Sequence, residues 1–347
     1  MDNNAEFELL RKRAADESKK RKKICIIGSL IIFGLILTLV LFVNNKGRSV
    51  TITRGQTIAF SIFLSIPISM FFLLLYNGIV FFAHPARHSM ATYRAAYKRY
   101  MIYSSLSEVF SNLKYYPDCG MPAPIVRNVM TTGDRYHSND FMTATYKDIN
   151  FTQADVHTEE RHETRDSDGH THTTYTTIFK GRFLIFDFKR DFSFRLQLIG
   201  KKFWGARLVS GAGENKFKKI ETESHEFNKQ FKIYAQDGFE AFYILDPSFI
   251  EKIQAIGTYY KNSILFSFMD KKLVVAINDG NDSFEAPHPA KLTDLTAEKA
   301  RIAQDIMTIV QFVDKLSLSR YMFEGKKKWK SSHGMSMASA PSSRKET

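Results

Sequence analysis

The chain has 347 residues, of which 44% are hydrophobic and 24% charged, and its formal net charge is +13. It contains two cysteines, Cys25 and Cys119, which excludes a disulfide scaffold and is typical of a reducing compartment. Residues 101–319 carry 27 Lys and Arg against 29 Asp and Glu, so the positive charge is concentrated elsewhere. A nucleic-acid-binding domain carries a basic surface on its folded part, so this distribution argues against nucleic acid as a partner.

Two long apolar runs near the N-terminus, 24–43 and 57–83, contain no charged residue. Twenty helical residues span about 30 Å, which matches the hydrocarbon core of a bilayer. The second run includes Pro67, which a membrane helix tolerates as a kink. The runs predict a transmembrane helical hairpin with a short external loop at 44–56.

The distribution of Lys and Arg around these runs predicts the orientation of the hairpin. The segment 1–23 contains eight of them, whereas the loop 44–56 contains three. By the positive-inside rule, we expect an inner-membrane protein with two spans, whose termini and main domain lie in the cytoplasm. Its basic membrane borders would meet the lipid bilayer at anionic headgroups. A cleaved signal peptide is the alternative for the first run, but that run is long for one and a second span follows.

The rest of the chain predicts one mixed α+β domain. A basic cytoplasmic segment, 1–23, precedes the hairpin, and an amphipathic connecting helix, 84–116, follows it. The α+β domain covers 117–320, and a basic, Ser-rich tail, 321–347, is expected to be disordered. Within the domain we predict strands at 175–188, 192–199, 231–234, 263–269 and 272–277, and helices at about 247–260 and 293–318.

Four histidines among acidic residues form the one cluster that suggests chemistry. They lie between residues 155 and 172 and are His157, His162, His170 and His172. Imidazoles with carboxylates suit zinc or another divalent metal, but the spacing follows no established ligand pattern. A two-stranded ribbon that turns at 166–169 would bring His162 near His170 or His172 across the strands. A solvated hairpin without a bound metal is the simpler explanation of the segment, and a partner-binding or pH-responsive role is a further alternative.

No catalytic motif is recognisable in the sequence, and no cofactor is required by it. We therefore expect a non-enzymatic, membrane-tethered module for interaction or sensing. The alternative is a metal-dependent enzyme that uses the His- and acid-rich ribbon 155–172.

Several ordered motifs are similar to those of an uncharacterised family of bacterial and archaeal membrane proteins, some labelled galanin-like. The first is Phe179-Lys-Gly-Arg-Phe183 with Asp187-Phe-Lys189. The others are Glu223-Ser-His-Glu-Phe-Asn-Lys-Gln-Phe231, Tyr234-Ala-Gln-Asp237 and Ala241-Phe-Tyr-Ile-Leu-Asp-Pro247. The resemblance covers about 85–320, with Asp246 where the family usually has Thr.

This resemblance implies a domain of unknown function without established catalytic residues. Some members look like companions of LemA-type membrane proteins, which implies a membrane protein partner. The motif residues also have structural explanations. Gly181 suits a close approach of two backbones, and Asp246–Pro247 suits the start of a helix.

Overall fold

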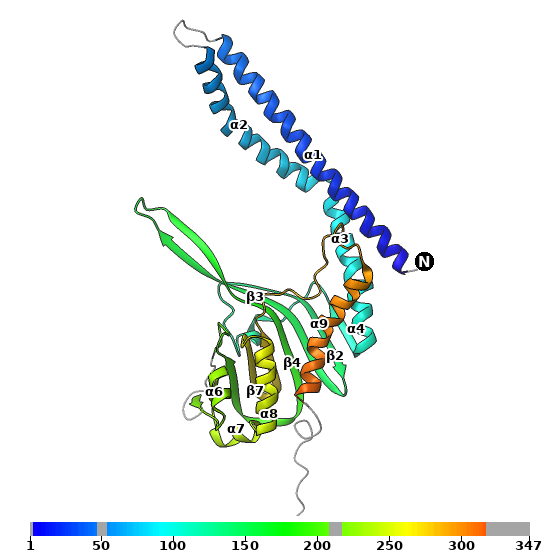
Figure 1. Ribbon diagram of the computed structural model, residues 1–347, viewed down its shortest axis with the longest axis vertical. Helices are drawn as coiled ribbons and strands as arrows, with labels where there is room; N and C mark the ends of the chain where they lie inside the picture. Colours follow the sequence, from blue (N-terminus) through cyan, green and yellow to red (C-terminus); the bar gives the residue numbers. More distant parts are fainter. Residues whose placement is uncertain (1–2, 47–53, 208–216, 317–347) are drawn as a thin grey trace, which may run out of the picture. The chain divides into compact units, whose positions relative to one another are not determined.

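The computed structural model of the protein describes residues 3–46, 54–207 and 217–316 (Figure 1). Its chain divides into two compact units, one of Met1–Cys119 with Asp282–Thr308, and the other of Gly120–Asn281 with the residues from Ile309 onward. The predicted tail, 321–347, and most of the predicted loop between the apolar runs lie outside the described residues. A long helical pair together with a large antiparallel sheet confirms the α+β class.

The first unit begins with two long helices, α1 (Asn3–Lys46) and α2 (Arg54–Ala83), which contain the predicted spans. Both are long and apolar enough to cross a membrane. Pro67 lies within α2. Helix α1 continues without interruption from the basic segment 1–23 into the apolar run.

The predicted connecting helix 84–116 differs from the structure at its C-terminal end. The helical stretch consists of α3 (Ala86–Tyr97), a π-helical segment η1 (Lys98–Tyr103) and α4 (Ser104–Val109), and strand β1 (Ser111–Tyr116) follows. Asn112 has a φ of 52°, which a right-handed helix does not allow. Leu113 and Tyr115 are half-buried while their neighbours are exposed, and this alternation is that of a strand.

The second unit is built on an antiparallel sheet. Strand β2 pairs with β3, β3 with β4, β4 with β6, and β6 with β5. The bounds are Arg135–Tyr146 for β2, Ile149–Arg165 for β3, Thr171–Gly200 for β4, Lys218–Ile220 for β5 and Phe231–Ala235 for β6. The strands predicted separately at 175–188 and 192–199 belong to the one strand β4, whose register against strand β7 (Ile264–Ile277) shifts between Asp187 and Phe192.

Strand β7 (Ile264–Ile277) folds back on itself as the predicted hairpin. The Asn278 N–H donates to the Ser263 carbonyl at 2.9 Å, although a straight strand would separate these residues by roughly 50 Å. Asp270, at the predicted turn, has a φ of 52°. The two halves of β7 therefore pair with different parts of β4.

Short helices complete the second unit. They are α5 (Ala123–Val126), α6 (His225–Gln230), α7 (Gly238–Ile244) and α8 (Pro247–Tyr259). The Asp246 side chain accepts a hydrogen bond from the Phe249 N–H, which confirms the predicted cap of α8. Helix α9 (Leu295–Lys315) begins in the first unit and ends in the second, where Phe312 packs against Phe186.

Candidate functional site

The N-terminal part of α1 packs against α3, which sequence reasoning missed. Phe7 is 1% exposed, and its ring lies 5.9 Å from that of Tyr93 and 6.4 Å from that of Tyr97. Tyr100 donates to the Glu6 carboxylate at 2.8 Å. The apolar Phe7 among charged residues was the available signal, but a single ring gives no helical period to detect.

A segment of the first unit that lies far along the chain also contacts α1 and α3. We call residues 285–290 the strap. Arg11 of α1 donates to the Pro289 carbonyl at 3.0 Å, and Tyr93 of α3 donates to the Pro287 carbonyl at 3.0 Å. Both helices are thus hydrogen-bonded to the strap backbone.

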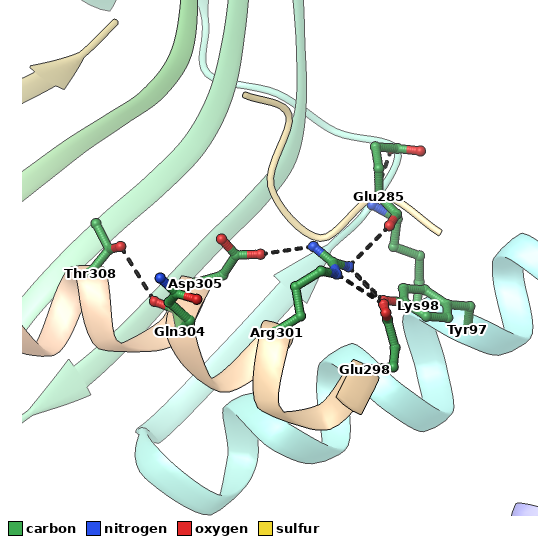
Figure 2. A network of polar contacts seen from close by, with 8 residues as sticks. All are labelled: Tyr97, Lys98, Glu285, Glu298, Arg301, Gln304, Asp305 and Thr308. Atoms are coloured by element: carbon green, nitrogen blue, oxygen red, sulfur yellow. Dashed lines mark hydrogen bonds and ion pairs between the residues drawn. The ribbon is translucent and has the colours of Figure 1, made fainter. Parts of the chain in front are cut away.

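A polar network around the buried Tyr97 hydroxyl lies beside the strap and joins α3 to α9 (Figure 2). Tyr97, which is fully buried, donates to the Glu298 carboxylate. Arg301 donates to the Tyr97 hydroxyl and to Glu298, each at 2.8 Å. It also donates to the Glu285 carbonyl at 3.3 Å and to Asp305 at 3.2 Å. The Arg301 guanidinium thereby connects α9 to α3 and to the strap.

Burial and charge set the protonation states in this network. Burial alone would raise the pKa of Glu298, but hydrogen bonds from Arg301 and Tyr97 outweigh it, and the pKa is lowered from its ordinary value. Burial and the Glu298 hydrogen bond raise the pKa of Tyr97 far above its ordinary value. Burial also raises the pKa of Tyr93 to about 12. A neutral tyrosine, a carboxylate and a guanidinium form a stable structural junction, and none of them is poised to exchange a proton near neutral pH.

The apolar parts of α1 and α2 pack through small and polar residues. A Cβ on Gly28 would lie 2.1 Å from the Tyr76 hydroxyl oxygen, so glycine allows this ring to cross α1. Tyr76 donates to the Ile24 carbonyl at 3.0 Å, and Asn77 donates to the Ser29 hydroxyl at 3.3 Å. Such contacts are the usual means of joining helices in an apolar solvent.

Two basic side chains contact aromatic rings at the end of this helical pair. The Arg21 guanidinium lies 5.1 Å from the centroid of the Phe81 ring, and that of Arg87 lies 5.3 Å from that of Phe82. These cation–π contacts bring positive charge to the border between the apolar and polar parts of the first unit.

The histidine segment forms the predicted two-stranded ribbon in the second unit. Arg165 pairs with Thr171, and the Asp166 N–H donates to the His170 carbonyl at 3.0 Å across the turn. His170 and His172 both approach the Asp166 carboxylate, at 3.5 and 3.2 Å. Hydrogen bonds to Asp166, first from the His170 backbone N–H, lower the pKa of that carboxyl.

The other two histidines lie elsewhere on the ribbon. His162 is opposite Thr174, and His157 lies 3.2 Å from the Thr177 hydroxyl. In the part of the chain that the structure describes, none of the four belongs to a group of three donors whose ligand atoms all lie within 4.8 Å of one another. The ribbon thus brings two of the predicted ligands to one carboxylate and keeps the other two apart.

Comparison with known proteins identifies the domain but no activity. Residues 177–318 match the family model described as "Protein of unknown function (DUF3137)". No curated protein matches the chain. A solved structure, the mycobacterial trehalose monomycolate transport factor A, TtfA, is similar over 65% of this chain and 98% of its own, with 10% identity and a TM-score of 0.35. The chain therefore contains an uncharacterised domain of unknown function.

Proposed function

We propose that the chain is a non-enzymatic module anchored in the inner membrane by α1 and α2, with its termini and main domain in the cytoplasm. The observation that carries the proposal is the uncovered apolar surface of these helices. Leu30, Leu35 and Leu74 are 67%, 64% and 67% exposed. A continuous surface of this kind is unfavourable in water and favourable in a bilayer.

The contacts of the N-terminal part of α1 with α3 and the strap support a role in coupling the membrane to the rest of the first unit. Because α1 is one continuous helix, a tilt or shift of its apolar part moves Phe7 and Arg11 at its other end. These residues contact α3 and the strap, which lead to the network around Arg301. A module that responds to a membrane protein partner would use such a rigid connection. From the family resemblance, LemA-type proteins are the first candidates for that partner.

Labelling with a membrane-impermeant maleimide in intact cells tests the orientation. Cys119 is exposed in the first unit, so it should react only after the membrane is opened. With Cys119 replaced by Ser, a cysteine introduced at Ser49 in the external loop should react in intact cells. Labelling of Cys119 in intact cells would contradict the proposal.

Purification of the full-length protein in mild detergent, followed by mass spectrometry and elemental analysis, tests the function. A stoichiometric membrane protein partner, without stoichiometric metal, is the expected result. Stoichiometric zinc, manganese or iron without a partner would instead favour the enzyme that uses the ribbon 155–172.

A further inference from the structure

Beyond the anchored module, the second unit contains an exposed two-stranded arm, which we define as residues 160–177. Figure 1 shows it extending from the sheet as a long hairpin of β3 and β4. The pairing of β2 with β3 begins at Glu159, and that of β7 with β4 begins at Arg182. Among the described residues, no strand pairs with either outer edge of the arm.

The two edges of the arm differ in their protection against pairing. The β3 edge carries Glu160, Arg161, Glu163 and Arg165, and charged residues are a common means of blocking edge-to-edge association. The β4 edge, Thr-His-Thr-Thr-Tyr-Thr-Thr over 171–177, contains no Asp, Glu, Lys, Arg, Pro or Gly and has a high β-propensity. Six of these seven residues are exposed, and Tyr175 is half-buried.

The edge of β4 without a neighbouring strand ends at Ile178, where contacts with Asn278 begin. The Asn278 side chain donates to the Ile178 carbonyl at 3.1 Å and accepts from the Lys180 N–H at 3.1 Å. Side-chain and loop contacts thus take the place of a neighbouring strand from Ile178 onward. Within the described part of the chain, the backbone groups of this edge that have no strand partner lie in the seven residues before Ile178.

We propose that this edge binds the same edge of a second copy of the chain, as an antiparallel pair centred on Thr174. In this register Thr171 lies opposite Thr177, His172 opposite Thr176, and Thr173 opposite Tyr175. None of these pairs contains Asp, Glu, Lys or Arg, and Thr–Thr pairs are favourable across strands. The Tyr175 ring contacts its own chain, where the Arg135 guanidinium lies 3.3 Å from its centroid. An antiparallel pair of identical edges has a two-fold axis, here through Thr174, and this symmetry closes the assembly as a dimer.

Disulfide cross-linking in native membranes tests the register. In full-length protein with Cys25 and Cys119 replaced by Ser, Thr174→Cys places two thiols opposite each other across the axis, and an oxidant should produce a cross-linked dimer. His162 lies directly opposite Thr174 on β3, so His162→Cys is the matched control. Its thiols would be about three strand spacings apart, roughly 14 Å, and should not cross-link. Equal cross-linking of the two variants would overturn the proposal.

Light scattering of the full-length protein in mild detergent tests the dimer itself. The wild type should be dimeric, and Thr174→Lys, which opposes two like charges, should raise the dimer dissociation constant roughly fivefold or more. Thr164→Lys on the β3 edge should leave the dimer dissociation constant unchanged. A monomeric wild type, or a Thr174→Lys protein as dimeric as the wild type, would overturn the proposal. The measurement needs no knowledge of orientation, so its failure is distinguishable from failure of the membrane proposal.

Discussion

Tyr97 is the residue at which the aromatic packing and the polar network of the first unit meet. Its ring contacts those of Phe7 and Tyr93, and its hydroxyl group both donates to Glu298 and accepts from Arg301. Hydrogen bonds to charged groups contribute more to stability than neutral ones, and they contribute most where water cannot replace the partner. Removal of this hydroxyl is therefore a direct test of the network.

We expect Tyr97→Phe to destabilise the protein by about 1.5–3 kcal/mol, because two charged groups lose a buried partner. Thermal unfolding of the detergent-solubilised protein measures the change as a lower midpoint. Tyr103→Phe is the control, since Tyr103 is exposed in the same helical stretch and should change the midpoint little. Equal midpoints for the two variants would show that the hydroxyl contributes nothing.

The lowered pKa of Glu298 predicts a dependence of stability on pH. Its folded-state pKa lies below the ordinary value of 4.5, so the unfolded chain binds the proton more tightly. The stabilisation is complete above about pH 4.5 and is lost as the pH falls toward the folded-state value. Glu298→Gln should thus lower the unfolding midpoint most near neutral pH, and its difference from the wild type should shrink in acid. A difference that stays constant from pH 7 to pH 3 would contradict this assignment.

At the scale of elements, the packing of α1 against α2 depends on which glycine of α1 faces its neighbour. A Cβ on Gly28 would collide with the Tyr76 ring, whereas a Cβ on Gly34 would meet nothing within 4 Å. Both glycines lie in the same apolar run, so they form a natural pair for comparison. Close approach at small residues is the main source of helix association in a bilayer.

We expect Gly28→Leu to separate the helices and break the hydrogen bond from Tyr76 to Ile24. Cysteines at Ser29 and Asn77, whose side chains are 3.3 Å apart, should form a disulfide in the parent protein, since both positions face the contact. Gly28→Leu should slow that disulfide severalfold, while Gly34→Leu should not. Equal rates in the two glycine variants would mean that Gly28 does not lie at the contact.

At the scale of the whole molecule, helix α1 has an apolar part suited to a lipid bilayer and a charged part suited to water. Leu30 and Leu9 of α1 are 67% and 64% exposed, yet the first lies in the uncharged run and the second among charged residues. A lysine at the centre of a membrane helix costs about 3 kcal/mol, so two of them offset the insertion energy of the run, about 5 kcal/mol.

We therefore expect Leu30→Lys with Leu35→Lys to prevent insertion of α1. A cysteine at Ser49, in the Cys119→Ser background, should then lose its reactivity toward an impermeant maleimide in intact cells. Leu9→Lys, at an equally exposed position outside the run, should keep it. Unchanged labelling of the double variant would contradict a membrane span at α1.

Local patterns of the sequence were sufficient to predict many elements. The apolar runs, the cap at Asp246, the hairpin of β7 and the ribbon around Asp166 depend on residues close together in the chain. The close approach predicted at Gly181 is also confirmed, since a Cβ there would lie 2.1 Å from the Ile277 carbonyl oxygen. Each of these features follows from hydropathy, capping or turn chemistry, which act over a few residues.

Tertiary structure decided which distant segments meet. Sequence reasoning treated 1–23 as a basic extension, because one phenylalanine among charges has no periodicity that predicts burial. The predicted helix 84–116 was also too long, because it included the residues that form strand β1 after the end of α4. The joining of Tyr97 to Arg301, 204 residues later, follows from no local rule. The sequence by itself determined the membrane-length helices, the α+β class and the histidine ribbon; the junction of α1, α3, the strap and α9 depends on packing between residues far apart in the chain.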